Sequence, residues 1–83
     1  MDYKVISVDG KVEEKKGKIG LRQAQQIVGG YVEVVRVQGG FLLVDEEAGM
    51  KAKQTPNQAA SELAGQMILG NAIFLKKMST LSE

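Results

Sequence analysis

Apolar residues recur along the chain in short runs that predict strands, and two stretches with helical spacing separate these runs. The first run, residues 3–8, precedes Asp9-Gly10, a dipeptide typical of a type I′ hairpin turn. The returning arm, residues 11–16, carries a single apolar residue. Because charged side chains discourage pairing with another chain, we expect this arm to form a solvent-facing edge strand.

Helical spacing first appears over residues 21–28. The apolar side chains there form one stripe opposite polar ones, and the stripe consists of Leu21, Ala24, Ile27 and Val28. Gly29 stands where a left-handed residue ends a helix, and Gly30 permits the turn into the next strand. This pattern predicts a short helix that packs through one face.

A second hairpin is predicted from strands at residues 31–38 and 41–46, which flank the glycine pair 39–40. The first of these strands breaks simple alternation at its valine pair, residues 34–35. If one residue bulges there, the valines share one face; without a bulge, both faces carry valine. The second strand is apolar on both faces, and we expect it to be the central strand.

The second helix has a clear predicted start. Thr55 can cap a helix, Pro56 suits its first position, and Gln58 completes a capping box. Small residues follow on one face, and Gly65 ends the helix. A last strand is predicted over residues 71–76.

The order of elements predicts an α+β domain over residues 1–77, with a polar C-terminal tail at 78–83. We expect a mainly antiparallel sheet of about five strands with two short helices on one face (ββαββαβ). The other face should then be polar, yet two strands are apolar on both sides. Either the sheet curls around this second face, or a partner covers it. We expect homo-oligomerisation through an exposed apolar interaction surface formed by Phe41, Leu43 and Phe74.

Composition limits the available chemistry. The 83 residues include no cysteine and no histidine, which removes thiolate chemistry and the commonest transition-metal ligand. Eleven basic and ten acidic residues give a net charge of +1, so nothing attracts nucleic acid or anionic membrane in general. No apolar run is long enough to span a bilayer, and none follows a basic start as in a signal peptide. We expect a cytoplasmic protein.

Three patterns occur in a fixed order: a Gly-Gly-aromatic turn, an acidic hairpin exit, and Asn-x-x-Ala-x-x-Leu. They lie in Val28-Gly-Gly-Tyr-Val-Glu-Val-Val35, Leu43-Val-Asp-Glu-Glu47, Pro56-Asn57, Ala59–Gly65 and Gly70-Asn-Ala-Ile-Phe74. From about Leu21 to Leu75 the chain thereby resembles a small family of uncharacterised domains found largely in bacteriophages and other mobile elements. It departs at Met50-Lys-Ala-Lys-Gln54, where that family more often carries a Gly-Leu-Pro-like loop. The resemblance implies a phage-like origin and this fold, and no mechanism.

No reactive centre is recognisable among the residue types present. Ser7, Thr55 and Ser61 have no histidine to activate them. The acidic residues 45–47 would diverge on a strand exit, so we interpret them as a solvated strand end rather than a weak cation site. The glycine pairs lack a phosphate-loop motif and are interpreted as a helix end and a turn. We expect a protein that is not an enzyme and that uses no cofactor or metal.

The start of the second helix is the candidate ligand site. Free backbone N–H groups at a helix N-terminus favour an anion, such as a nucleotide or a phosphorylated signal. The candidate ligand-binding residues are Lys51, Lys53, Thr55, Asn57 and Gln58. The alternative is that Thr55 and Gln58 satisfy these N–H groups themselves as a capping box.

The densest basic stretch runs from Lys11 to Arg22, but Glu13 and Glu14 interrupt it, which favours a solvated edge over a nucleic-acid surface. The sequence therefore favours a small phage-type interaction protein that acts stoichiometrically on a host or phage component. Two alternatives stay open. One is a sponge that sequesters a nucleotide-derived signalling molecule, and the other is a nucleic-acid-binding accessory protein.

Overall fold

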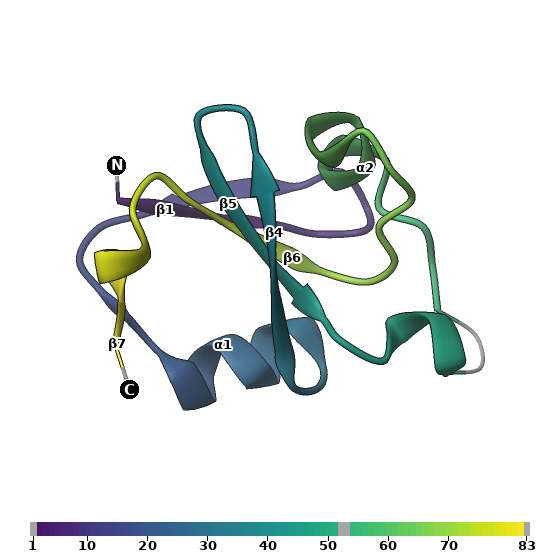
Figure 1. Cartoon of the computed structure of the whole chain (residues 1–83), viewed down its shortest axis with the longest axis horizontal. Coiled ribbons are helices and arrows are strands. Elements are labelled where there is room, and N and C mark those ends of the chain that lie inside the picture. The colour runs from purple at the N-terminus through teal and green to yellow at the C-terminus, as the bar shows by residue number, and fades with distance from the viewer. Residues whose placement is uncertain (1, 52–53, 83) are drawn as a thin grey trace.

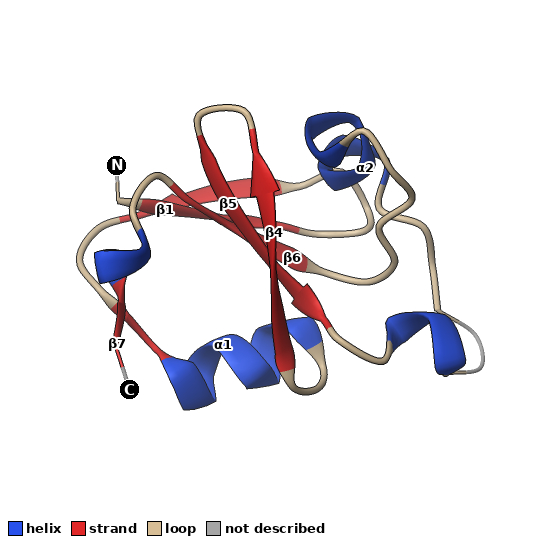
Figure 2. Ribbon diagram, in the orientation of Figure 1, coloured by secondary structure: helices blue, strands red, loops and turns tan. Residues whose placement is uncertain are grey.

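A five-stranded antiparallel sheet forms the centre of the molecule in the computed structural model, which describes residues 2–51 and 54–82 (Figures 1 and 2). The strand order is β2-β1-β6-β5-β4. The strands are β1 (Tyr3–Ile6), β2 (Val12–Lys15), β4 (Val32–Val37), β5 (Gly40–Asp45) and β6 (Ala72–Leu75). The helices are α1 (Leu21–Val28) and α2 (Gln58–Ala64). The predicted α+β class, the antiparallel sheet and the two short helices are confirmed.

The two helices cover opposite faces of the sheet, and the expectation that both lie on one face is wrong. Helix α1 packs on the face of the sheet that carries Tyr3, Val5, Leu43, Ile73 and Leu75, and together they form the α1-side core. Helix α2 packs on the opposite face, which carries Ile6, Leu42, Val44, Ala72 and Phe74, and together they form the α2-side core. β5 and β6 carry apolar side chains on both faces, so both faces of the sheet must be buried. Helix α1 buries one face and helix α2 buries the other.

This arrangement also removes the predicted apolar interaction surface. Leu43 is fully buried in the α1-side core, and Phe74 is buried in the α2-side core. Phe41 is half-buried, with the guanidinium of Arg36 5.9 Å from the centre of its ring. The three side chains therefore lie on different faces and do not form one patch.

Strand order and register differ from expectation in detail. The central strand is β6, and β5 lies beside it. The β4–β5 ladder runs without a bulge, so valines occupy both faces of β4. Both hairpin turns lie one residue earlier than predicted. The N–H of Gly10 donates to the carbonyl of Ser7, and the pairing of Val37 with Gly40 leaves residues 38–39 as the loop. Each turn contains one glycine with positive φ, Gly10 in the first and Gly39 in the second.

Residues 78–82 belong to the fold, and the prediction of a polar tail is wrong for them. Residues 78–80 form a short 3₁₀ helix, and β7 (Leu81–Ser82) pairs in parallel with β3 (Ile19–Gly20). Met78 and Leu81 pack against the α1-side core, which explains why this segment is held in place. No helix in the described ranges has the length and apolar character needed to cross a membrane.

Gly40 is required where β5 approaches the end of β6. A Cβ on Gly40 would overlap the carbonyl oxygen of Leu75 and lie 3.0 Å from Cζ of Phe74. Since the overlapped atom is backbone of the central strand, the strands would have to separate. We expect Gly40→Ala to lower the free energy of unfolding by about 1–3 kcal/mol, measured by urea denaturation. Gly49→Ala is the matched control because a Cβ there meets nothing within 4 Å; equal losses in both variants would contradict the argument.

Candidate interaction site

The start of α2 is built around Asn57, which is fully buried. Its Oδ1 accepts a hydrogen bond from the N–H of Ala60 at 3.1 Å, so Asn57 is the N-cap. Its Nδ2 donates to the carbonyl oxygens of Ile6 and Gly70, both at 2.9 Å. Asn57 therefore joins α2 to β1 and to the segment before β6. The prediction that Thr55 caps this helix is wrong by two residues.

The described members of the predicted anion site do not converge on the helix start. Asn57 turns into the core, and its backbone N–H already donates to a carbonyl at 2.8 Å. Thr55 and Gln58 are exposed, and Lys51 is held by other groups. Lys53 lies outside the described residues. The helix start is thus used internally, to connect elements of the fold.

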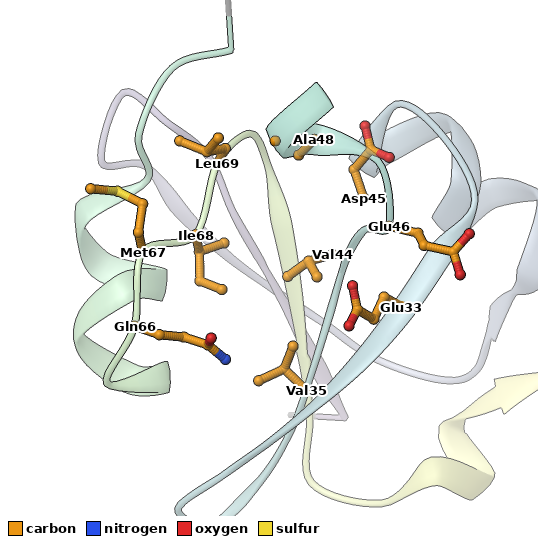
Figure 3. A pocket seen from close by; sticks show the side chains of 11 residues that line it. Glu33, Val35, Val44, Asp45, Glu46, Ala48, Gln66, Met67, Ile68 and Leu69 are labelled. Atoms are coloured by element: carbon orange, nitrogen blue, oxygen red, sulfur yellow. The ribbon is translucent and has the colours of Figure 1, made fainter. Parts of the chain in front are cut away.

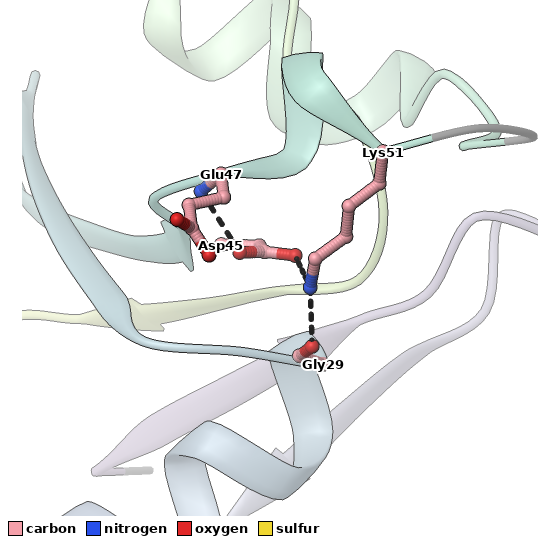
Figure 4. Close-up of polar contacts among 4 residues, drawn as sticks. All are labelled: Gly29, Asp45, Glu47 and Lys51. Atoms are coloured by element: carbon pink, nitrogen blue, oxygen red, sulfur yellow. Dashed lines mark hydrogen bonds and ion pairs between the residues drawn. The ribbon is translucent and has the colours of Figure 1, made fainter.

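Lys51 pairs with Asp45 at the end of β5 (Figure 4). Its Nζ lies 2.6 Å from Oδ2 of Asp45 and 2.6 Å from the carbonyl oxygen of Gly29, at the end of α1. The other carboxylate oxygen of Asp45 accepts from the N–H of Glu47 at 3.0 Å. The Asp45 side chain has no exposed surface. The interpretation of residues 45–47 as a solvated strand end is therefore wrong for Asp45.

Gly30 leaves the space that this ion pair occupies. A Cβ on Gly30 would lie 2.6 Å from Oδ1 of Asp45 and 2.8 Å from Nζ of Lys51. Burial alone would raise the pKa of Asp45. The hydrogen bonds from Lys51 and Glu47, together with the Lys51 charge, outweigh burial and hold the pKa of Asp45 below its ordinary value of 3.8. Asp45 is therefore ionised at neutral pH, and its contact with Lys51 ties the segment after β5 to the end of α1.

Within residues 2–51 and 54–82, β4 is an outer strand of the sheet, and β5 is its one neighbour. None of its six residues is buried, whereas four residues of β5 are. The N–H of Glu46 donates to the carbonyl of Tyr31 at 2.8 Å. Because hydrogen-bonding direction alternates along an antiparallel ladder, the odd-numbered residues of β4 bond to β5. The backbone groups of Val32, Val34 and Arg36 consequently point away from the sheet.

A cleft of about 210 Å³ lies beside β4, between the sheet and the connection from α2 to β6 (Figure 3). Its floor is apolar and consists of Val35, Val44 and Ile68. Glu33 points into the cleft from β4, and Gln66 extends toward it from the opposite side (Figure 3). In the part of the chain that the structure describes, no basic side chain lines the cleft and none forms an ion pair with Glu33. The cleft thus combines an apolar floor with two carboxylates that have no ion-pair partner among the described residues, Glu33 and Glu46, and of these Glu33 points into the cleft (Figure 3).

The sequence carried signals for some of these features. Asn57 precedes Ala60 by three residues, which is the spacing of an N-cap and its bonded N–H. Asp45 continues the row of alternate β5 positions, 41 and 43, that faces α1. Nothing local to β4 shows that it lies at an edge, because strand order is set by distant pairing.

Comparisons with known proteins give a family without an assigned activity. A family model described as a domain of unknown function, DUF3846, matches residues 3–81. The matched range includes residues 21–75 and extends past both ends of that stretch. No curated protein and no solved structure matches the chain significantly.

Proposed function

We propose that this protein, which belongs to the DUF3846 family, is a non-enzymatic interaction protein that binds an extended segment of another protein along β4. The observation that carries the proposal is the unpaired edge of β4, which leaves the backbone groups of Val32, Val34 and Arg36 pointing outward. An extended segment can add to such an edge as a further strand, with main-chain hydrogen bonds for affinity and side-chain pockets for specificity.

The two edges of the sheet differ in a way that favours β4. β2 is four residues long, and three of them are charged: Glu13, Glu14 and Lys15. Short, charged edges discourage strand addition. β4 is six residues long and contains four valines, of which Val34 is 45% exposed. This protein therefore protects one edge and leaves the other open to a partner.

The proposal retains the wider context that the sequence suggested. A stoichiometric binder needs no reactive groups, which accords with the absence of histidine and cysteine from the chain. The partner in this proposal is a host or phage protein, and the encounter takes place in the cytoplasm of the host cell. Strand addition could block a surface of that partner or bridge it to another protein.

The alternatives have less geometric support among the described residues. A nucleotide sponge would use Lys51 and the start of α2, but Lys51 neutralises Asp45, and Asn57 is occupied by protein groups. A nucleic-acid surface along residues 11–22 would present exposed lysines, yet Lys15 lies 3.7 Å from the carboxylate of Glu13. We therefore keep strand addition as the principal hypothesis.

Selection of peptides from a random twelve-residue display library, with the purified full chain as bait, tests the proposal. We expect selected peptides to protect the amides of Val32, Val34 and Arg36 from hydrogen exchange. Val34→Lys should abolish binding, because it places a charge in the middle of the edge without removing a ladder bond. Val12→Lys, on the exposed β2 edge, is the matched control and should bind normally.

Two results would contradict the proposal. One is that selected peptides protect amides elsewhere and bind Val34→Lys as well as the original protein. The other concerns self-association. If light scattering shows a dimer that Val34→Lys converts to a monomer, then β4 pairs two copies of the chain, and the edge is not free for a different partner.

A further inference from the structure

We infer that the partner segment carries a lysine or arginine whose side chain crosses β4 and ends at Glu33 in the cleft. This inference rests on the proposed function, because it names the chemistry of a strand bound at the β4 edge. Four features of the β4 edge support it: the volume of the cleft, its apolar floor, the carboxylate of Glu33, and the two-fold symmetry that pairing with a second copy would impose.

The volume of the cleft suits one long side chain. At about 210 Å³ it is smaller than the roughly 300–1,000 Å³ typical of sites for drug-sized ligands. Neighbouring strands lie about 4.8 Å apart, so a side chain from an added strand must pass over β4 to reach the cleft. Short side chains would stop beside Glu33 and Val35, whereas the stems of lysine and arginine are long enough to continue.

The lining of the cleft matches the two parts of a basic side chain. An aliphatic stem can lie on the apolar floor formed by Val35, Val44 and Ile68. The charged head would then meet the carboxylate of Glu33, with the amide of Gln66 opposite (Figure 3). Glu46 stands at the rim with its carboxylate directed away, so it adds negative potential without a contact (Figure 3).

Asp45 does not compete for the basic residue. It lines the same cleft, but its Oδ2 is paired with Nζ of Lys51 and its Oδ1 accepts from the N–H of Glu47. Glu33, by contrast, is exposed and has no ion-pair partner among the described residues. Because the Glu46 carboxylate points away from the cleft, the partner's charge is directed to Glu33.

Pairing with a second copy through β4 would not supply this charge. A two-fold axis through an antiparallel strand pair places like faces together, so Glu33 can oppose only odd-numbered residues of the other β4. The odd-numbered residues of β4 are Glu33, Val35 and Val37, and none is basic. The charge of Glu33 therefore favours a different chain as the occupant.

The same display selection tests the inference through the sequences it returns. We expect the bound peptides to share one lysine or arginine, with apolar residues two positions away on the same face. Replacing that basic residue by methionine, or changing Glu33→Gln in the protein, should weaken binding at least tenfold. Glu14→Gln, the same charge change on β2, should leave binding unchanged.

A charge reversal provides the sharper control. Selection against Glu33→Lys should return peptides with aspartate or glutamate at the shared position. If peptides bind β4 but show no basic preference and tolerate Glu33→Gln, the inference is wrong while strand addition stands. If no peptide protects the β4 amides, both the inference and the proposed function are wrong.

Discussion

Asn57→Ala is expected to lower the free energy of unfolding by about 3–5 kcal/mol, the largest effect of any single substitution considered for this protein. The change removes the two hydrogen bonds that Nδ2 donates to the buried carbonyls of Ile6 and Gly70, at about 1–2 kcal/mol each. It also removes the N-cap of α2, worth about 1 kcal/mol. A domain of this length has a total stability of roughly 4–12 kcal/mol, so the variant should be close to unfolding at room temperature.

Urea denaturation followed by circular dichroism measures this effect, and Thr55→Ala is the matched control. Thr55 is exposed and its side chain caps nothing, so its loss should change stability by less than about 0.5 kcal/mol. Asn57→Asp separates capping from hydrogen-bond donation. The aspartate keeps the oxygen that caps α2, but it replaces the Nδ2 donor with a second oxygen, which cannot donate to the carbonyls of Ile6 and Gly70. A larger loss for Thr55→Ala than for Asn57→Ala would show that the cap lies where the sequence pattern placed it.

Lys51→Met should lower the free energy of unfolding by about 2–4 kcal/mol. Removing one partner of a buried ion pair typically costs about 3–5 kcal/mol, because the remaining charge is left without compensation. The Asp45 side chain has no exposed surface, but 35% of the Lys51 side chain is exposed, and water entering there reduces the loss. The double change Lys51→Met with Asp45→Asn should recover part of the stability, since the amide oxygen can still accept from Glu47.

The same pair predicts the direction of a pH dependence. The pKa of Asp45 is lower in the folded chain than its ordinary value of 3.8, so the unfolded state binds protons more readily. The stabilisation is therefore complete above pH 3.8, declines below it, and is lost once the pH falls past the folded pKa. Asp45→Asn should flatten the stability profile between pH 5 and pH 2 relative to the original chain. An unchanged acid profile would contradict the buried pair.

The local sequence pattern predicted most helices and strands correctly, but it did not predict which elements pack against each other. The periodicity at residues 21–28 and the glycine after it predicted α1 and its end correctly. The two hairpins were recognised from their turn dipeptides, each with the turn displaced by one residue. The cap of α2 was misplaced because both Thr55 and Asn57 are acceptable caps locally. Only Asn57 can also donate to carbonyls that β1 and the segment before β6 bring within reach.

From the order of residues alone one can derive the α+β class, the two helices and the absence of histidine and cysteine side chains. These depend on periodicity, turn residues and composition, which are properties of short segments. Only the packed chain shows that α1 and α2 cover opposite faces, that Lys51 reaches Asp45, and that β4 is left at an open edge. Each of these results depends on contacts between segments that are far apart in the sequence. The free energy of such contacts cannot be estimated from the residues of one segment alone.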